Sequence, residues 1–260
     1  MAASRPFLSV IIPAYNEAQR LPGTIPLVVN FLSAQGYTYE IIVVDDGSTD
    51  RTTSIVRQLT ARYPRLALLP LTHCGKAYAV RKGVLAAGGE RVLMTDADLS
   101  APIGQASELM QCLDDGYDIA IGSREGPGAR RYGEPAYRHL MGRIFNLAVR
   151  LITGSPHQDT QCGFKLFRAD AARDIFSSLR LYAENAQPVS GPMVTGLDVE
   201  VLQVARRRGY RVQEVGVEWH YGRGSKVRPV LDSYRMFKDI TQVRLNDIRG
   251  RYNTQSGRGR

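Results

Sequence analysis

The sequence predicts an α/β protein with a mostly parallel central sheet flanked by helices. Short runs rich in Val, Ile and Leu alternate with amphipathic helical patterns through the first half of the 260-residue chain. The run YEIIVVDD at 39–46 is nearly all apolar, which is typical of a parallel strand covered on both faces. Strands separated by helices of this length imply right-handed crossovers and hence a parallel sheet.

The first half of the chain supplies five of the expected strands. They are predicted at 8–15, 39–46, 65–71, 91–98 and 117–124, with helices at about 24–34, after residue 49, at 78–87 and at 103–113. Ser48 or Thr49 is expected to cap the second helix, with Asp50 near its positive end.

The second half is less regular. It predicts a Gly/Pro/Arg loop at 125–135, helices at 137–154, 198–208 and 230–245, strands at 164–167 and 210–219, and an irregular stretch at 183–196. Because there is no repeat and no clear linker, one domain is expected over 1–249. The basic tail at 250–260 is expected to be disordered.

The charge balance favours an anionic partner. The net charge is +9, with 34 Lys and Arg against 25 Asp and Glu, although general solubility is the simpler explanation. Nucleic acid is disfavoured, since the arginines cluster on one helix and the tail instead of alternating with exposed aromatic residues. Three cysteines without a CxxC pair indicate reduced thiols rather than disulfides or a zinc site. No stretch resembles a signal peptide or a spanning helix, so the chain is expected to be cytosolic, and binding to a bilayer surface stays open.

Four polar clusters fall at expected strand ends, where open α/β sheets bind ligands. They are residues 13–17, 45–48, 96–98 and 122–124. Any one of them could simply be a solvated strand end, but four together predict a shared rim around a ligand.

Asp96 and Asp98 are the most informative cluster. On an extended backbone these two side chains point to the same face, where their charges repel unless a cation lies between them. The chain has neither GxGxxG after its first strand nor GxxxxGK[ST], and Gly75-Lys76 alone is a weak phosphate signal. We therefore expect Mg²⁺ or Mn²⁺ at this pair, neutralising a leaving diphosphate.

Several motifs together resemble glycosyltransferase family 2. They are SVIIPAYNE, EIIVVDDGSTDRT, DADLS, IGSR, DTQCGFKLF and GSKV, in this order over about residues 7–245. CGFKLF and GSKV make the chain similar to the polyprenyl-phosphate branch, the dolichyl-phosphate glucose and mannose synthases. Two departures stand out: Ser100 replaces a glutamine frequent in the family, and HCGKA lacks the second glycine of the glucosyltransferase-like RGKGG pattern.

The resemblance implies a GT-A fold and inverting transfer from a nucleotide sugar. Residues 1–124 would form the nucleotide-sugar half and 125–249 the acceptor and membrane-facing half. The implied donor-site residues are Pro13, Tyr15, Glu17 and Asp45 or Asp46 for base and ribose, Lys76 for the base or diphosphate, and Asp96, Ala97 and Asp98 around the metal. Asp96 and Asp98 are the implied metal ligands.

Charge logic extends this to the acceptor. A lipid monophosphate is an anion that cations must hold near the anomeric carbon, and the candidates are Arg124, Arg138, Arg223 and Lys226. Asp159, which completes the catalytic set with Arg124 and Arg138, matches an aspartate of such enzymes, and the resemblance implies that it orients the acceptor or accepts a proton. A structural role, capping the TQCG turn, is the alternative.

Three further choices stay open. Asp198 and Glu200 either stabilise a helix start or, if the acceptor is a sugar hydroxyl, supply a base; the structural role is favoured. Helix 137–154 either packs its stripe in the core or lies in a membrane interface with its arginines toward anionic head groups, which is slightly favoured. The third choice is the sugar.

The leading hypothesis is a metal-dependent transfer of glucose from UDP-glucose to a dolichyl-type polyprenyl phosphate, by a peripheral protein on the cytoplasmic face of a membrane. Mannose from GDP-mannose is the near alternative. A hydroxyl acceptor, or nucleotide-sugar binding without turnover, are more distant ones.

Overall fold

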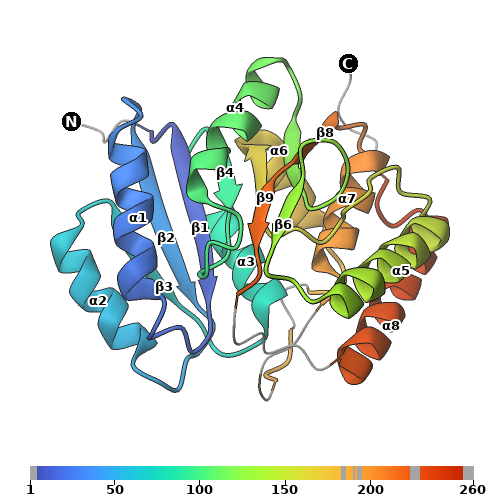
Figure 1. Ribbon diagram of the computed structural model, residues 1–260, viewed down its shortest axis with the longest axis horizontal. Coiled ribbons are helices and arrows are strands. Elements are labelled where there is room, and N and C mark those ends of the chain that lie inside the picture. The colour runs from blue at the N-terminus through green and yellow to red at the C-terminus, as the bar shows by residue number, and fades with distance from the viewer. Residues whose placement is uncertain (1–4, 183–185, 190, 192–194, 223–228, 254–260) are drawn as a thin grey trace.

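The computed structural model describes residues 5–182, 186–189, 191, 195–222 and 229–253, with only the backbone described over 229–234. It confirms the α/β class. The main sheet has seven strands in the order β3-β2-β1-β4-β7-β5-β8 (Figure 1). All are parallel except β7, which is antiparallel to both of its neighbours. A second sheet pairs β6 with β9 in parallel.

The strands are β1 Leu8–Ala14, β2 Tyr39–Asp45, β3 Leu66–Pro70, β4 Arg91–Met94, β5 Ile119–Ser123, β6 Arg130–Tyr132, β7 Lys165–Arg168, β8 Val212–Gly216 and β9 Glu218–His220. The helices are α1 Leu21–Ser33, α2 Thr52–Arg62, α3 Lys76–Ala86, α4 Ala106–Asp114, α5 Ala136–Thr153, α6 Ala169–Ser178, α7 Leu197–Arg207 and α8 Pro229–Ile248, with a 3-10 turn at Ile103–Gln105.

Successive residues of β1 and β2 face opposite layers of helices, and both layers are packed. Ile11 lies in one core cluster, with residues of α3, α6, α7 and α8. Val10 and Ile12 lie in the other, with α1, α2 and α4. Both faces are buried, which is why these strands are apolar throughout rather than alternating.

The secondary-structure predictions fail at several places. The expected strand 210–219 is two strands in different sheets, because Val217 between them is buried and donates its N–H to Ser123 of β5. Helix α6 was not predicted, although its buried Ala171, Ala172, Ile175 and Phe176 have helical spacing. Strand β6, within the expected loop, has three residues and no apolar pattern of its own. The residue expected to cap α2 was also wrong.

Helix α2 begins at Thr52, so Ser48 and Thr49 do not cap it. The N-cap residue is Arg51, without a side-chain capping bond, and Asp50 Oδ1, one residue earlier, accepts from the Thr52 N–H at 2.8 Å. The Ser48 hydroxyl oxygen instead accepts from the Asn16 N–H at 2.9 Å and connects the turn after β2 to the end of β1.

The tail expected to be disordered from residue 250 is ordered at its start. Residues 250–253 form a turn in which Tyr252 is fully buried, and its hydroxyl donates to Glu200 of α7 at 2.8 Å. The sequence contained one indication of this order, because Tyr252 is an aromatic residue in a stretch that is otherwise basic and polar. Residues 254–260 lie outside the described chain.

Helix α5 presents an apolar face to solvent. The exposed residues on it are Tyr137, Leu140, Met141, Ile144, Leu147 and Leu151, which recur at helical spacing. Helix α8, which packs beside α5 (Figure 1), adds exposed Phe237, Leu245 and Ile248. We call these nine residues the apolar face. The stripe of α5 therefore does not pack in the core, which removes the first of the two interpretations of this helix. Along the described residues, every helix is too short or too polar to cross a membrane.

Two substitutions test this assignment of core and surface. Ile11→Ala should lower the free energy of unfolding by about 2–5 kcal/mol, since it empties a fully buried site. Leu147→Ala, on the apolar face, should change it by less than about 0.5 kcal/mol. Urea denaturation of both variants measures the difference. An equal loss in the two would mean that the α5 stripe is packed after all.

Candidate active site

The candidate site lies where β1, β2, β4 and β5 end. Because these strands are parallel, their carboxyl ends share one edge of the sheet. The antiparallel β7 enters from that same edge, and its first residue, Lys165, pairs with Met94 of β4 and Ile121 of β5. The loop before β7, which carries Asp159 and Gly163, is therefore brought to the ends of the other strands.

Asp46 organises the part of this edge that follows β2. Its carboxylate is 1% exposed and accepts from the Cys74 and Gly75 N–H groups, both at 2.9 Å, while His73 Nδ1 lies 2.8 Å from it. Burial raises the pKa of Asp46 even though these three contacts oppose the shift. The aspartate holds residues 73–75 in place at the start of α3.

The ring of His73 stacks on Tyr15, with centroids 3.9 Å apart and planes 1° from parallel. Asp45 is also buried, and its carboxylate accepts from the Ser48 N–H and the Thr53 hydroxyl. Glu17 pairs with Arg20 at 2.8 Å. The structure thus brings Tyr15, Glu17, Asp45 and Asp46 together at one end of the sheet, beside Pro13, which lies within β1. Their contacts with a nucleotide stay predictions.

The backbone at Asp96 and Asp98 is not extended as expected. Strand β4 ends at Met94, and the two aspartates lie in a turn that includes Leu99 at φ 48°. The sequence argument that both carboxylates share a face of a strand was therefore wrong in its geometry. The buried Ala97 between them fixes the turn, because its carbonyl accepts from the Thr24 hydroxyl at 2.6 Å.

Asp96 is paired with the Lys76 ammonium. Desolvation alone would raise its pKa, but Lys76, with Lys165 and Arg124 nearby, lowers the pKa of Asp96 below its ordinary value. Gly163 packs so closely on this carboxylate that any Cβ there would collide with Asp96 Oδ2. The glycine of the CGFKLF motif is thus explained by the space that Asp96 needs.

Asp98 is exposed, and its Oδ1 accepts from the Ser100 N–H at 3.0 Å. Its other oxygen faces Gly222, where a Cβ would come within 3.1 Å of it. Among the described residues, no group of three or more His, Cys, Asp or Glu side chains is arranged to hold a metal ion. The protein therefore offers Asp96 and Asp98 as hard oxygen ligands without a described third carboxylate.

Arg124, whose side chain is 20% exposed, forms a bidentate ion pair with the fully buried Asp159. Arg124 donates Nε to Asp159 Oδ2 at 2.7 Å and Nη2 to Oδ1 at 2.9 Å, and its backbone N–H also donates to Oδ2 at 2.9 Å. The Gln161 N–H also donates to Asp159 Oδ1, at 3.1 Å. Burial of Asp159 opposes its ionisation, yet Arg124 lowers its pKa far below the usual range.

Asp159 is thus fully occupied and fully ionised at neutral pH, which does not fit a proton acceptor. The expected alternative, capping of the TQCG turn, is part of its role, and holding Arg124 is the larger part. The Arg124 guanidinium also lies 5.5 Å from the centre of the Trp219 ring, and Arg131 lies 5.9 Å from it. Arg138, in the first turn of α5, lies over Tyr221 at 5.4 Å. Arg223 and Lys226, the other predicted phosphate ligands, lie outside the described residues.

Three residues of the site were missed. Lys165 is fully buried and donates to the Cys162 carbonyl at 2.6 Å and to Asp198. A lysine in the apolar strand FKLF needs a buried counter-charge, and that signal was readable. His73 and Trp219 carried no such signal, because their roles depend on partners distant in sequence. His157, two residues before Asp159, faces a separate cavity.

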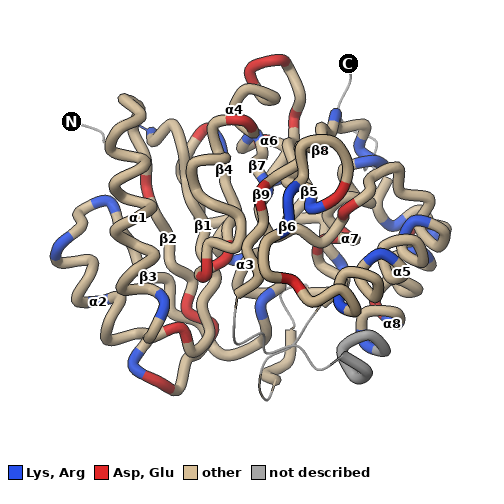
Figure 2. Tube along the Cα trace, in the orientation of Figure 1, with Lys and Arg blue, Asp and Glu red and all other residues tan. Residues whose placement is uncertain are grey.

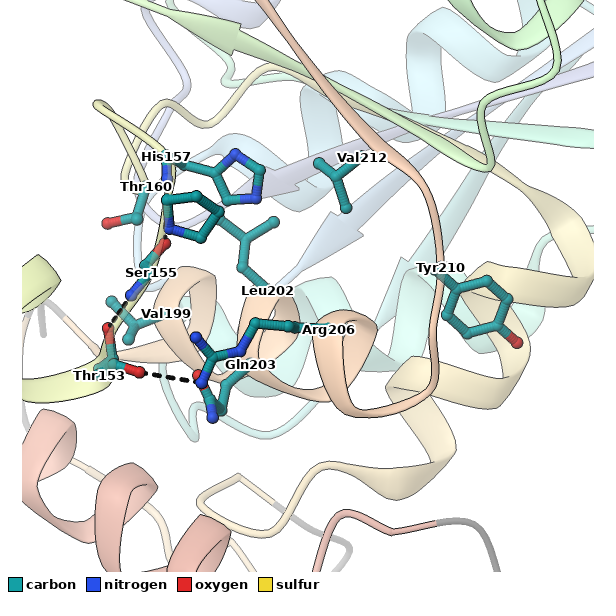
Figure 3. Close-up of a pocket in the computed structure, with 11 residues that line it drawn as sticks. Thr153, Ser155, His157, Thr160, Val199, Leu202, Gln203, Arg206, Tyr210 and Val212 are labelled. Atoms are coloured by element: carbon teal, nitrogen blue, oxygen red, sulfur yellow. Dashed lines mark hydrogen bonds between the residues drawn. The ribbon is translucent and has the colours of Figure 1, made fainter.

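That cavity has a volume of about 180 Å³ and lies behind the loop that carries Asp159. Figure 3 shows it bounded by α7, with Leu202 and Arg206, by Val212, and by the loop with Ser155 and His157. Arg206 donates to the Thr153 carbonyl at 3.1 Å, and Glu214 accepts from the backbone of residues 158 and 159. The cavity contains none of the predicted site residues, and its walls support the loop from behind.

Asp198 and Glu200 follow the favoured structural interpretation. Asp198 neutralises Lys165. Glu200 is buried, its pKa is raised by burial, and it accepts hydrogen bonds from Arg180, Leu181 and Tyr252.

The charge distribution in Figure 2 places many Lys and Arg positions around α5, α7 and α8.

Comparison with solved structures identifies the fold. Glucosyl-3-phosphoglycerate synthase from Mycobacterium tuberculosis, in complex with uridine diphosphate, matches with a TM-score of 0.60 at 18% identity, over 98% of this chain and 83% of that one. The mannosyltransferase PcManGT from Pyrobaculum calidifontis matches with a TM-score of 0.58 at 21% identity, over 99% of this chain and 67% of that one. Fold and site together define the class of GT-A glycosyltransferases.

Sequence comparison then gives the family. The Glycosyl transferase family 2 model matches residues 9–176. The chain is 32% identical to the dolichyl-phosphate beta-glucosyltransferase of Homo sapiens, over 96% of this chain and 79% of that protein. It is 31% identical to that of Saccharomyces cerevisiae, over 95% and 76%. The chain belongs to glycosyl transferase family 2, which confirms the resemblance, and is a glycosyltransferase.

The pairing of Arg124 with Asp159 makes a testable prediction about their roles. Asp159→Asn should lower the rate of transfer about a hundredfold, because the buried arginine loses its counter-charge and its fixed position. Arg124→Lys should cost about as much, and the double variant little more, because the two residues act as a unit. The acid limb of the rate–pH profile should be unchanged in Asp159→Asn; loss of that limb would indicate a proton acceptor.

The same pair sets the sign of a stability effect. The pKa of Asp159 is lowered in the folded state, so its stabilisation is present above about pH 4, the unfolded value, and is lost as the pH falls toward the folded one. The difference in unfolding free energy between wild type and Asp159→Asn should be constant between about pH 5 and 8 and shrink below about pH 4.

Proposed function

We propose that this glycosyltransferase moves glucose from UDP-glucose to a dolichyl-type polyprenyl phosphate, with inversion at the anomeric carbon. The single observation that carries the proposal is the buried pair of Arg124 and Asp159, at the sheet edge that also carries Asp96 and Asp98. A rigid cation beside a carboxylate pair suits an anionic acceptor meeting a diphosphate-linked donor. The names of the relatives at 31–32% identity support the lipid acceptor and glucose.

The donor half of the site would use the residues around Asp46. The stacked Tyr15 and His73 rings and the end of β1 at Pro13 would face the nucleoside, with Glu17, Asp45 and Asp46 positioning that surface. Lys76, now paired with Asp96, would approach the diphosphate when the donor binds, because its ammonium already lies beside the aspartate pair.

A divalent ion, Mg²⁺ or Mn²⁺, fits the residues present. Asp96 is held ionised by its neighbours, and Asp98 is exposed, so both can act as hard oxygen ligands. When bound, such an ion neutralises charge on the leaving diphosphate. The donor's own phosphate oxygens and water would complete the coordination.

The acceptor half needs position more than base catalysis. A phosphate monoester is already ionised at neutral pH, so its oxygen can attack without losing a proton to the protein. Arg124, fixed by Asp159 and Trp219, would hold that phosphate beside the anomeric carbon, with Arg138 as a second cation. Arg223 and Lys226 stay predicted contributors on sequence grounds alone.

The apolar face of α5 and α8 would dock the protein on a membrane that carries the lipid acceptor. Its apolar residues would enter the acyl boundary while Arg138, Arg143 and Arg150 of α5 approach anionic head groups. We place it on the cytoplasmic leaflet, where nucleotide sugars and anionic lipids are both available.

The first test is a transfer assay with UDP-glucose, GDP-mannose, dolichyl phosphate and Mg²⁺ or Mn²⁺. Lipid-linked glucose should form from UDP-glucose and disappear with chelator. Asp98→Asn should lower the rate at least about a hundredfold, because it removes a metal-ligand charge. Asp115→Asn, an exposed aspartate at the end of α4, is the matched control and should be unaffected.

Each other outcome has a meaning. Product from GDP-mannose alone would move the assignment to mannose, which the missing glycine in HCGKA leaves open. Donor hydrolysis without lipid product would favour a hydroxyl acceptor. Full activity in chelator, together with an active Asp98→Asn, would contradict the metal.

The membrane surface is tested by vesicle sedimentation. Leu147→Glu should weaken binding to vesicles containing anionic lipid at least about tenfold. It replaces an apolar side chain that would be buried in the bilayer with a negative charge that anionic lipid repels. Leu27→Glu is the control, because Leu27 of α1 is equally exposed but lies outside the apolar face. Equal weakening in both variants, or none in either, would contradict docking through α5 and α8.

A further inference from the structure

Asp239 of helix α8 accepts hydrogen bonds from two residues that lie far from it in the sequence. Asp239 Oδ2 accepts from the Gly196 N–H at 2.9 Å and from the Tyr182 hydroxyl. These two partners lie on either side of the 183–195 segment, of which the structure describes residues 186–189, 191 and 195. A single side chain thus holds both flanks of that segment.

The described part of the segment contacts the donor side of the site. The Val189 N–H donates to the His73 carbonyl at 3.0 Å, and His73 Nε2 lies 3.1 Å from the Gly191 carbonyl. The Cys74 thiol donates to the Ala186 carbonyl at 3.5 Å. His73 therefore has Asp46 on one ring nitrogen and this segment on the other, and it stacks on Tyr15 at the same time.

The flanks are packed too tightly for a chance contact. A Cβ on Gly196 would come within 2.7 Å of Asp239 Cβ, so the glycine is required by the approach of α8. On the other flank, Glu200 of α7 accepts from the Arg180 N–H at 2.8 Å and from the Leu181 N–H at 3.2 Å. Burial and the nearby Asp239 raise the pKa of Tyr182, so its hydroxyl keeps its proton and donates.

From these contacts we propose that Asp239 is a positioning residue for donor binding, acting through its bonds to Tyr182 and Gly196 and through the described residues between them on the ring of His73. The role rests on the proposed function only in taking the Tyr15–His73 surface as the place of the nucleoside. Removal of the carboxylate would free both flanks, loosen the contacts at His73 and leave the surface for the base poorly ordered. Arg124, the residue proposed to hold the acceptor, takes no part in the contacts described here, so acceptor binding should be little affected.

The test combines nucleotide binding with hydrogen–deuterium exchange. Asp239→Ala should raise the dissociation constant for UDP, and KM for the donor, about tenfold, as expected for losing two hydrogen bonds to a charged acceptor. KM for the lipid acceptor should stay within about twofold. Amide exchange in a peptide spanning 71–78 should become faster, since its His73 contacts are weakened.

Two further variants and a control make the result specific. Tyr182→Phe, which removes only the hydroxyl, should give part of the effect, and Asp239→Asn, which keeps an acceptor oxygen, should restore part of it. Asp247→Ala is the matched control: it removes another α8 carboxylate, one paired with Arg207 and Arg244 and without a hydrogen bond or ion pair to the described residues of the segment. It should lower stability without changing exchange at 71–78 or UDP affinity.

The outcomes separate this proposal from the proposed function. If wild type does not bind UDP, the donor assignment fails, while the exchange comparison still reports whether Asp239 orders residues 71–78. If exchange at 71–78 and UDP affinity are the same in Asp239→Ala and Asp247→Ala, the positioning role is wrong. Equal rises in both KM values would indicate general destabilisation and would also overturn it.

Discussion

The buried ammonium of Lys165 is the constraint on which the site depends. An uncompensated charge at full burial costs several kcal/mol, so the strand that carries Lys165 can pair between β4 and β5 only if neighbours supply negative charge. Asp198 of α7 and the Cys162 carbonyl do so, and Asp96 lies close enough for Lys165 to lower its pKa. One lysine thus connects β7, α7 and the aspartate turn. The antiparallel strand that carries Lys165 also delivers Gly163 and Asp159 to the edge.

Around this constraint, the carboxylates divide into two kinds. Asp45, Asp46, Asp159 and Glu200 are buried, and their oxygens are occupied by N–H and O–H donors from the protein. Asp96 is 36% exposed at its side chain, and Asp98 is exposed. Exposure therefore separates the groups that can meet a ligand from the groups that hold loops. The same logic argues against Asp159 as a base, because an acceptor with no free lone pair and a lowered pKa has little affinity for a proton.

The sequence predicted what depends on local pattern and failed where partners are distant. The apolar runs of β1 and β2 and the polar ends of the strands were readable, as were Asp96, Asp98 and Arg124. The geometry at Asp96 was not, because strand β4 ends at Met94 and the aspartates lie in a turn whose Ala97 carbonyl accepts from Thr24, a residue distant in sequence. The stacking of His73 on Tyr15, the burial of Tyr252 and the separation of β8 from β9 all depend on contacts between segments many residues apart. For α5, one sequence pattern fitted two environments, and only the burial of each residue could choose between them.

The exposed apolar face and the donor site meet in α8. Phe237 belongs to the face, and Asp239, two residues on, holds the flanks of the segment that contacts His73. Residues two apart on a helix point about 200° from one another, so one side of α8 can face a bilayer while the other faces the protein. Under the proposed function, the side of α8 that would meet lipid and the side that would order the nucleoside site are thus opposite sides of one helix. With a water-soluble donor and a lipid acceptor, this arrangement would let each substrate approach its own side of the reaction centre without crossing the other.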